Sequence, residues 1–395
     1  MRVAFTLIGG HDWTGGRNYL LNLLRVLTAH QAGSIEPLLF VDSGLPPAEL
    51  VSFQSIAGVE LIGSRALAKQ RRTRRLLSAM VCGRDAQWCE ELAEQRTDVV
   101  FEAAQYFGWR LELPAIAWMP DFQHREMRSL FSRAGRLKRE LGFRAQVHSG
   151  RTIMLSSEHA RGLCESYYPS TIGRAFTVRF AVPAVEGIDA VEARRIADLY
   201  ALPEHFFYMP NQFWQHKNHL LVLEALAILK SRGVQVVVVA SGRQLDPRKP
   251  GYVESILAKV RELGLEQQFR VLGMVPQAHV TALMLSCEAL LNPSRYEGWS
   301  TTVEEARSLG APLMLSDIPV HREQAEESAT YFDPDDAQGL AAALASFEPL
   351  SSDSRMRARV LGSNAAAARV RRFAEDFASV ARQCAQRGRA QRIRA

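Results

Sequence analysis

Short β-rich runs alternate with longer stretches of helical periodicity along the whole chain, and this alternation constrains the fold most strongly. The predicted strands of the first half are residues 3–8, 38–41, 59–62, 99–102, 115–119 and 153–156, and those of the second half are 207–209, 236–240, 270–272, 289–292, 312–315 and 331–332. Strands separated by helices favour parallel sheets with helices on both faces. The sequence therefore predicts an α/β protein with two doubly wound, Rossmann-like domains facing a central cleft.

The boundary between the two series is predicted in the segment "FAVPAVEGIDA", residues 180–190, which contains Pro and Gly and shows little periodicity. A chain of 395 residues is long enough for two cores of ordinary size. We predict an N-terminal domain over residues 1–185, a C-terminal domain over 186–370, and a closing helix with a basic tail over 371–395. Ligands of doubly wound sheets bind beyond the carboxyl ends of the strands, so functional residues are expected there.

Composition limits where such a chain works. Its longest apolar runs are far shorter than the ~20 residues that cross a bilayer, and its start is typical of a buried strand rather than a cleaved signal peptide. Five cysteines without metal-ligand spacing predict reduced thiols. We therefore expect a cytoplasmic protein.

The formal net charge of +6 is clustered in residues 69–75, 125–151 and the C-terminal segment. Such clusters can attract anionic lipid headgroups, although many charge runs are only solvated helix faces. Peripheral contact with the inner face of a membrane is thus one expectation. Nucleic acid is not expected as a partner, because no binding signature accompanies the charge.

The stretch "RYEGWSTTVEEARSL", residues 295–309, places two acids around a predicted helix start. Glu297 precedes the helix, Ser300 or Thr301 is its expected N-cap, and Glu305 lies in its second turn. Backbone N–H groups at a helix start, together with the helix dipole, favour phosphate. Two carboxylates on either side could then bind the hydroxyls at the two ends of a nucleotide sugar, although either acid could simply stabilise the helix.

The run from residue 290 to 323, "LLNPSRYEGWSTTVEEARSLGAPLMLSDIPVHRE", resembles the donor-binding signature of the family-four retaining glycosyltransferases of the GT-B class, with its E-x7-E motif. The resemblance extends to "NQFWQHKNH" at 211–219, "SSEHARGL" at 156–163, "DFQH" at 121–124 and "TGG" at 14–16. It implies a C-terminal domain that binds a nucleoside-diphosphate sugar and an N-terminal domain that binds the acceptor.

The resemblance also implies roles for single residues. Lys217 faces the diphosphate, Glu297 contacts the transferred sugar, and Glu305 takes the ribose hydroxyls. Asn211 stands where many relatives have an arginine, so phosphate neutralisation would depend more on Lys217. The remaining expected donor contacts are Gly298, Trp299, Ser300, Thr301, Thr302 and Val303, together with Ser241 and Gly242 after the strand at 236–240.

On the N-terminal side, Asp121 and His124 follow a predicted strand and are the expected acceptor-side catalytic residues. Pro120 stands where relatives often place a histidine. Gly15 and Gly16 could seat a phosphate or the acceptor at a helix start, or could only form a tight turn. The Asp-x-Asp of "FDPDD", residues 332–336, is interpreted as a structural turn, so no metal and no cofactor are expected beyond the sugar nucleotide.

The predicted function is retaining, metal-independent transfer of a hexose from a UDP- or GDP-sugar to a hydroxyl of a glycan or lipid-linked acceptor, in bacterial polysaccharide or glycoconjugate synthesis. No carboxylate is clearly placed as a nucleophile, which favours front-face attack over double displacement. The alternatives are a sugar-nucleotide epimerase on the same fold and a non-catalytic nucleotide-sugar-binding protein.

Overall fold

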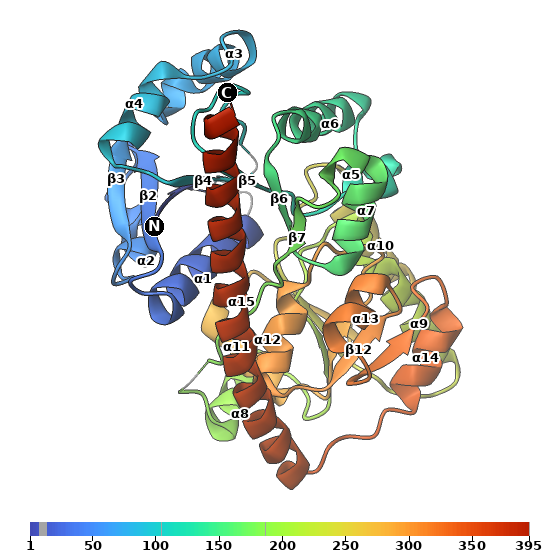
Figure 1. Cartoon of the computed structure of the whole chain (residues 1–395). Helices are drawn as coiled ribbons and strands as arrows, with labels where there is room; N and C mark the ends of the chain where they lie inside the picture. Colours follow the sequence, from blue (N-terminus) through green and yellow to red (C-terminus); the bar gives the residue numbers. More distant parts are fainter. Residues whose placement is uncertain (8–13, 104, 186, 395) are drawn as a thin grey trace. The chain divides into compact units, whose positions relative to one another are not determined.

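The computed structural model describes residues 1–7, 14–103, 105–185 and 187–394 (Figure 1). Contacts divide the chain into two compact units. Unit 1 comprises residues 1–126, 133–181 and 369–395, and unit 2 comprises residues 127–132 and 182–368. The change between units near residue 181 falls inside the Pro- and Gly-containing segment. Residues 127–132 lie in the N-terminal half of the chain but belong to unit 2, and no feature of the sequence predicts this assignment.

Unit 1 is built on a seven-stranded parallel sheet with the order β3-β2-β1-β4-β5-β6-β7. Its strands are β1 (Arg2–Thr6), β2 (Glu36–Asp42), β3 (Glu60–Ser64), β4 (Val99–Ala103), β5 (Ala115–Trp118), β6 (Thr152–Leu155) and β7 (Ala175–Thr177). Its helices are α1 (Thr14–His30), α2 (Val51–Gln54), α3 (Arg72–Val81), α4 (Ala86–Glu94), α5 (Gln123–Glu126), α6 (Arg133–His148) and α7 (Glu158–Tyr167), with short 3-10 turns η1 (Pro47–Glu49), η2 (Lys69–Arg71) and η4 (Pro169–Thr171).

Unit 2 is built on a six-stranded parallel sheet with the order β10-β9-β8-β11-β12-β13. Its strands are β8 (Phe207–Met209), β9 (Val238–Ser241), β10 (Phe269–Gly273), β11 (Leu290–Asn292), β12 (Leu313–Ser316) and β13 (Ala329–Phe332). Its helices are α8 (Ala190–Leu199), α9 (His219–Ser231), α10 (Tyr252–Glu262), α11 (Gln277–Ser286), α12 (Thr301–Leu309), α13 (Pro319–Ala325) and α14 (Ala337–Ala345), with 3-10 turns η3 (Arg128–Leu130) and η5 (Gln215–Lys217).

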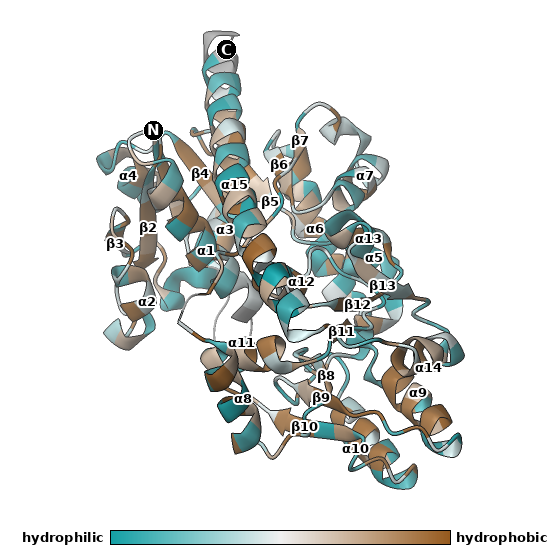
Figure 2. Cartoon of the chain, turned by 90° about the horizontal axis from the view of Figure 1, so that it is seen from below, coloured by the Kyte–Doolittle hydropathy of each residue, from teal (hydrophilic) through white to brown (hydrophobic). Residues whose placement is uncertain are grey.

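Both sheets are buried on their two faces, as parallel sheets require. In unit 2, one cluster of apolar side chains includes α9 and α14, which are mostly brown in Figure 2, and a second includes α11 and α12. The strand order reverses between β8 and β11, so the chain leaves these two neighbouring strands toward opposite sides. Such a reversal opens space beyond the strand ends and is where ligands of doubly wound sheets bind.

The predicted fold class is confirmed, and each of the twelve predicted strands overlaps an observed one. The strand that the sequence pattern missed is β7 (Ala175–Thr177). It has three residues, which is too short for a run of alternating or continuous apolar residues to identify it.

The last helix, α15 (Ser352–Arg394), begins well before the predicted start at residue 371. An Ala-rich stretch without Gly or Pro, residues 363–370, lets the helix continue without interruption. Residues from 369 onward belong to unit 1, where the ring of Phe377 lies 5.7 Å from that of Phe5 and 5.6 Å from that of Phe101.

None of the helices within the described residues is long and apolar enough to span a membrane.

A buried ion pair joins β4 to the start of β6 in unit 1. Arg151 donates from Nε to Glu102 at 3.1 Å and from Nη2 to the carbonyl of Gly108 at 2.6 Å, and both charged side chains are almost fully buried. Removing one partner of such a pair leaves a charge without compensation in the core.

The substitution Arg151→Met should therefore lower the free energy of unfolding by about 3–5 kcal/mol, because Glu102 would keep its burial and lose its cation. Urea unfolding followed by circular dichroism measures the change. The matched control is Arg161→Met, which removes an exposed pair with Glu158 and should change stability by less than ~1 kcal/mol. Equal effects of the two substitutions would contradict the structural role of the buried pair.

Candidate functional site

Two asparagines meet where β8 and β11 end in unit 2. Asn211 lies two residues beyond β8, and Asn292 is the last residue of β11. Because these strands are neighbours and parallel, their ends bring both side chains together, and Asn211 donates from Nδ2 to Oδ1 of Asn292 at 3.1 Å. Both side chains are buried, and Oδ1 of Asn211 has no hydrogen-bond partner among the described residues. An unsatisfied buried acceptor at this edge favours a ligand or water donor.

The hydrogen-bond chain continues from Asn292 into the start of α12. Nδ2 of Asn292 donates to Oγ of Ser300 at 3.0 Å, and Oγ of Ser300 lies 3.2 Å from Oγ1 of Thr302. Ser300 is the N-cap residue, as one of the two sequence alternatives had it, but its side chain makes no capping hydrogen bond. Its hydroxyl is held by the strand end instead, which leaves the first turn of α12 without a side-chain cap.

The E-x7-E pair lies around this helix start. Gly298, Trp299, Thr301 and Thr302 are partly exposed, whereas the side chain of Val303 is fully buried in the core of unit 2. Val303 can therefore reach a ligand only through its backbone. Its predicted role in diphosphate binding depends on its N–H group and not on its side chain.

Lys217 and Glu297 form a close ion pair. Nζ of Lys217 donates to Oε1 of Glu297 at 2.5 Å, and their side chains are only 14% and 9% exposed. The sequence pattern assigned these residues to different parts of the donor, and the structure joins them directly. A charged pair with so little solvent is held firmly until another anion or hydroxyl group competes for it.

The position of Lys217 depends on Asn218. Asn218 has a left-handed backbone, with φ of 61°, between η5 and α9. Its side chain donates to the carbonyl of Pro334 at 2.8 Å and accepts from Nε of Arg295 at 3.2 Å. Asparagine tolerates this backbone conformation better than most residues, so it fixes the turn that carries Lys217.

Two buried histidines, His216 and His321, stay neutral in this part of unit 2. Burial lowers the pKa of His216 well below its ordinary value and lowers that of His321 to about 4. The charge of Glu297 raises the pKa of His321 and that of Lys217 lowers it, but burial has the larger effect. Nδ1 of His321 lies 2.9 Å from the carbonyl of Ser316, so the neutral ring keeps its proton there and presents Nε2 as an acceptor.

Glycine is required at position 242 because the backbone there lies close to the backbone of Asn211. Its φ is 140°, and a Cβ atom at this position would lie 2.6 Å from the carbonyl oxygen of Asn211. Only glycine therefore lets the end of β9 pass the loop after β8. Ser241 is buried, and its hydroxyl lies 2.6 Å from that of Tyr208, so a ligand would meet this predicted donor-binding residue through its backbone and not through its hydroxyl.

The two adjacent acids of α12 have different surroundings. Glu304 is buried and accepts hydrogen bonds from Arg307 at 2.6 Å and from Gln324 at 3.1 Å, which makes it a structural residue. Glu305 accepts from Nε2 of Gln277, at the start of α11, at 3.2 Å. Burial raises the pKa of Glu305 to about 7, although its side chain stays partly exposed. A hydrogen-bond donor from a ligand would stabilise the charged form.

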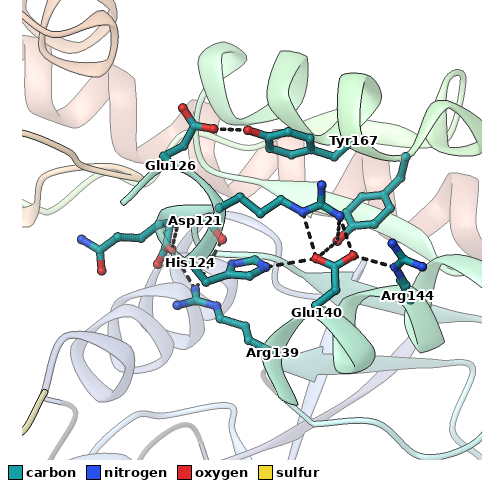
Figure 3. Close-up of polar contacts among 10 residues, drawn as sticks. Asp121, His124, Glu126, Arg139, Glu140, Arg144 and Tyr167 are labelled. Atoms are coloured by element: carbon teal, nitrogen blue, oxygen red, sulfur yellow. Dashed lines mark hydrogen bonds and ion pairs between the residues drawn. The ribbon is translucent and has the colours of Figure 1, made fainter. Parts of the chain in front are cut away.

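Unit 1 holds Asp121 and His124 in a dense polar cluster after β5 (Figure 3). Asp121 pairs with Arg139 of α6 at 2.8 Å and accepts from the backbone of Gln123 at the same distance. His124 is buried, with Nε2 3.4 Å from Glu140, and burial lowers its pKa. Its Nδ1 atom has no hydrogen-bond partner among the described residues.

Glu140 organises this cluster. Its carboxylate accepts from Nε of Arg125 at 2.8 Å, from Arg144 at 2.6 Å and from the hydroxyl of Tyr168 at 3.1 Å. Burial would raise its pKa, but the hydrogen bonds from both arginines outweigh that effect and lower the pKa to about 2. Glu140 therefore stays ionised and holds the neutral imidazole of His124 in place.

The remaining predicted residues lie elsewhere. Gly15 and Gly16 are in the first turn of α1, while most of the preceding motif, residues 8–13, lies outside the described residues. In the "FDPDD" segment, Asp333 accepts from the backbone of Asp335, and Asp336 caps α14 through the backbone of Gln338 at 2.9 Å. These contacts agree with the interpretation as a turn. Over the part of the chain that the structure describes, no three Asp, Glu, His or Cys side chains gather as metal ligands do.

Several site residues were not predicted from the sequence. Asn292 carried a signal, because it is a polar residue that ends an apolar strand run. Glu140 carried a weaker one, since it pairs with Arg144 at helical spacing. Gln277 and His321 had no signal in the sequence, because only the fold brings them close to site residues that are distant in the sequence.

Comparison with protein families supports the resemblance drawn from the sequence. Residues 195–366 match the family described as glycosyl transferases group 1, and this part of the chain contains the E-x7-E pair and Lys217. The predicted relationship to glycosyltransferases is thereby confirmed for this part of the chain.

Curated relatives match over shorter stretches. The O-antigen chain mannosyltransferase RfbU of Salmonella typhimurium is 28% identical over 148 residues, which cover 37% of this chain and 39% of the relative. The putative glycosyltransferase EpsF of Bacillus subtilis is 31% identical over 106 residues, covering 27% and 26%. The chain thus matches less than two fifths of the length of these relatives.

Solved structures resemble the chain over nearly its whole length. A glycosyltransferase from Rickettsia africae aligns with a TM-score of 0.70 at 13% identity, covering 97% of both chains. HepE of Anabaena, in complex with UDP and glucose, aligns with a TM-score of 0.65 at 15% identity, covering 98% of both chains. At such identities the likeness shows the fold, which is that of the GT-B glycosyltransferases.

The raised pKa of Glu305 predicts a pH effect on stability. A carboxyl group whose pKa rises from 4.5 to about 7 on folding makes the folded state less stable as the pH increases from about 4.5 to about 7, because the folded state must then hold the charge of a partly buried carboxylate. Glu305→Gln removes the charge, so the variant should gain stability relative to the wild type between pH 5 and pH 8. Urea unfolding at both pH values measures this gain. The exposed control Glu266→Gln should show the same difference at both, and a pH-independent effect of Glu305→Gln would contradict the assignment.

Proposed function

We propose, from the premise that residues 195–366 match the group 1 glycosyl transferase family, that the protein is a retaining hexosyltransferase that uses a nucleoside-diphosphate sugar. The observation that carries this proposal is the ion pair of Lys217 and Glu297 beside the start of α12, at the carboxyl edge of the unit 2 sheet. A cation and an uncapped helix start suit a diphosphate, and a carboxylate next to them suits sugar hydroxyls. A glycosyltransferase that uses a nucleotide sugar needs this combination.

In this proposal the diphosphate of the donor binds the ammonium group of Lys217, and the ion pair between Lys217 and Glu297 breaks. The ammonium group then neutralises the negative charge that grows on the leaving group as the glycosidic bond breaks, and the N–H groups of α12 do the same. Glu297, released from Lys217, accepts hydrogen bonds from the transferred sugar. A fixed cation in this place supplies what a divalent metal supplies elsewhere, which is why we propose a metal-independent reaction.

The other end of the donor is assigned to Glu305. Ribose hydroxyls would donate to its carboxylate and stabilise the charge that burial disfavours. Gln277, already bonded to this carboxylate, would orient it. Asn211 and Asn292 lie at the same strand edge, and the unsatisfied Oδ1 of Asn211 supplies a further acceptor.

The acceptor side is assigned to unit 1. His124 stays neutral because of its burial, and its Nδ1 atom can exchange a proton or a hydrogen bond with a hydroxyl. We propose that the acceptor hydroxyl attacks the anomeric carbon on the face that the diphosphate leaves, and that a phosphate oxygen receives its proton. The anomeric bond to phosphate breaks as the new glycosidic bond forms on the same face, so configuration is retained.

A glycan or lipid-linked acceptor in bacterial polysaccharide synthesis is proposed from the named relatives, which are O-antigen mannosyltransferases among others. We further propose that the protein works in the cytoplasm at the inner face of the membrane, where such acceptors are assembled. The basic clusters of unit 1 support peripheral contact, since they would meet anionic headgroups there.

The choice of donor can be tested by thermal stabilisation. UDP-glucose, GDP-mannose and ADP-glucose are added separately, and a donor at a hundred times its Kd should stabilise the folded chain by about 2.7 kcal/mol. We expect stabilisation by sugars of one base only, and Glu305→Ala should abolish it because the ribose contact is lost. If none of these nucleotide sugars stabilises the protein, the proposed function is wrong.

Turnover tests the roles of the ion pair. With the donor identified, Lys217→Ala and Glu297→Gln should each lower the rate of nucleoside-diphosphate release by about 10²–10³-fold, because transition-state charge loses its partner. Lys259→Ala, at a lysine of α10 that pairs with Glu262 at the surface, is the control and should leave the rate unchanged. Near-normal transfer by either site variant, or loss of wild-type activity in EDTA, would contradict this mechanism. Conversion of the donor without any acceptor would identify an epimerase instead.

A further inference from the structure

Helix α3 of unit 1 turns large apolar side chains toward solvent. Leu76, Leu77, Met80 and Val81 are 47%, 57%, 62% and 76% exposed, although the helix has only ten residues. Surface helices of globular proteins usually direct their apolar stripe to the core. An exposed apolar face of this size indicates that something other than water covers it.

The packing of α3 shows that this orientation is fixed. Its buried residue is Ala79, and Arg75, on the same side, donates from Nη1 to the carbonyl of Ala66 at 2.9 Å. At ~100° per residue, the four exposed apolar residues lie within an arc of roughly 140° on the other side. Arg72 and Arg74 lie on the two borders of this arc, so the apolar face has a cation along each edge.

Trp109 adds an exposed aromatic ring beside the turn that ends the helix, with Arg110 over the ring at 4.8 Å. The backbone N–H of Arg110 donates to the carbonyl of Gly83 at 2.7 Å, and a Cβ atom on Gly83 would lie 2.7 Å from Cε2 of Trp109. The indole is therefore packed against the turn that ends α3, and it remains 52% exposed. Tryptophan is enriched where a protein meets the interface of a bilayer, because its ring is apolar and its N–H group is polar.

The charge around this face is mostly positive. Residues 69–84 contain six basic side chains and no acidic one: Lys69, Arg71, Arg72, Arg74, Arg75 and Arg84. Of these, Arg84 pairs with Glu112, and Asp85 follows as the N-cap of α4. A second copy of the chain would bring the same positive charge to this face and be repelled. An anionic lipid surface satisfies both features, since acyl chains receive the apolar residues and headgroups receive the cations.

We propose that α3 and Trp109 form a docking surface for anionic phospholipid membranes, called here the α3 face. Leu76, Leu77, Met80, Val81 and Trp109 enter the boundary between headgroups and acyl chains, while Arg72 and Arg74 remain at the headgroups. The proposal specifies the surface through which the peripheral contact proposed above would act, and in that respect it rests on the proposed function.

Vesicle binding of the full chain is the test. Vesicles of phosphatidylcholine alone are compared with vesicles that also contain phosphatidylglycerol, in sedimentation assays at low and high salt. The wild type should bind the anionic vesicles at least tenfold more tightly than the neutral ones, and less tightly as salt increases. Equal binding to both kinds of vesicle, or no binding at low salt, would overturn the proposal.

Variants separate the apolar and the ionic parts of the α3 face. Leu77→Glu with Met80→Glu should reduce binding to anionic vesicles at least tenfold, and Arg72→Gln with Arg74→Gln should reduce it by about 30-fold. The matched control is Met356→Glu with Leu361→Glu, which changes one exposed Met and one exposed Leu of α15. Wild-type binding by both α3 variants, or an equal loss in the control, would assign the binding to another surface.

Tryptophan fluorescence and the oligomeric state give two further readouts. A vesicle-dependent blue shift of the fluorescence should disappear in Trp109→Phe, and a shift that persists would contradict insertion of this residue. If the wild type is a dimer that Leu77→Glu with Met80→Glu converts to a monomer, the α3 face is an interface between copies and the proposal fails.

Thermal stabilisation by UDP, GDP or ADP separates this proposal from the proposed function. The α3 variants should keep the nucleotide response of the wild type, because no residue of the α3 face lies in unit 2. Nucleotide binding without vesicle binding would refute the docking surface alone. Vesicle binding without any nucleotide response would refute the proposed function alone.

Discussion

Parallel pairing of β8 with β11 is the constraint on which the candidate donor site depends. The two strands are neighbours in the sheet although 81 residues separate Asn211 from Asn292 at their ends, and the sheet order reverses between them. Their carboxyl ends therefore bring these asparagines and the start of α12 to one edge. Lys217 and Glu297 follow the same two strands, so their ion pair is a consequence of strand order and not of local sequence.

Limited access of water to this site shifts the pKa values of its ionisable side chains. Buried imidazoles next to the ion pair stay neutral, and Glu305 holds a proton at higher pH than an ordinary glutamate. Charges interact more strongly where water is excluded, so each charge a ligand brings has a large effect. In unit 1 the pKa of a glutamate is lowered instead of raised. Two arginines keep Glu140 ionised, and Glu140 in turn contacts His124.

Predictions from the sequence succeeded where a signal was local. Strand runs, the helix start after Ser300 and the turn at Asp333 to Asp336 each follow from neighbouring residues, and the structure has all three. The predictions were less complete for contacts between side chains that are far apart in the sequence. The hydroxyl of Ser241 faces Tyr208, Glu304 is bound by Gln324, and His321 lies near Glu297. Each of these contacts joins different elements, which periodicity and composition do not connect.

Hydrophobic periodicity and helix-start chemistry are local, so the class of fold and the residues at the helix start of the E-x7-E motif could be predicted from the amino-acid sequence. Which side chains share an environment, and which face of a helix meets solvent, depends on how the elements pack. In the sequence, the segment that forms α3 is recognisable only as a basic run. In the structure, Ala79 faces the core, so the apolar residues on the other side of the helix face the solvent. Orientation depends on packing, and packing depends on contacts between residues far apart in the chain.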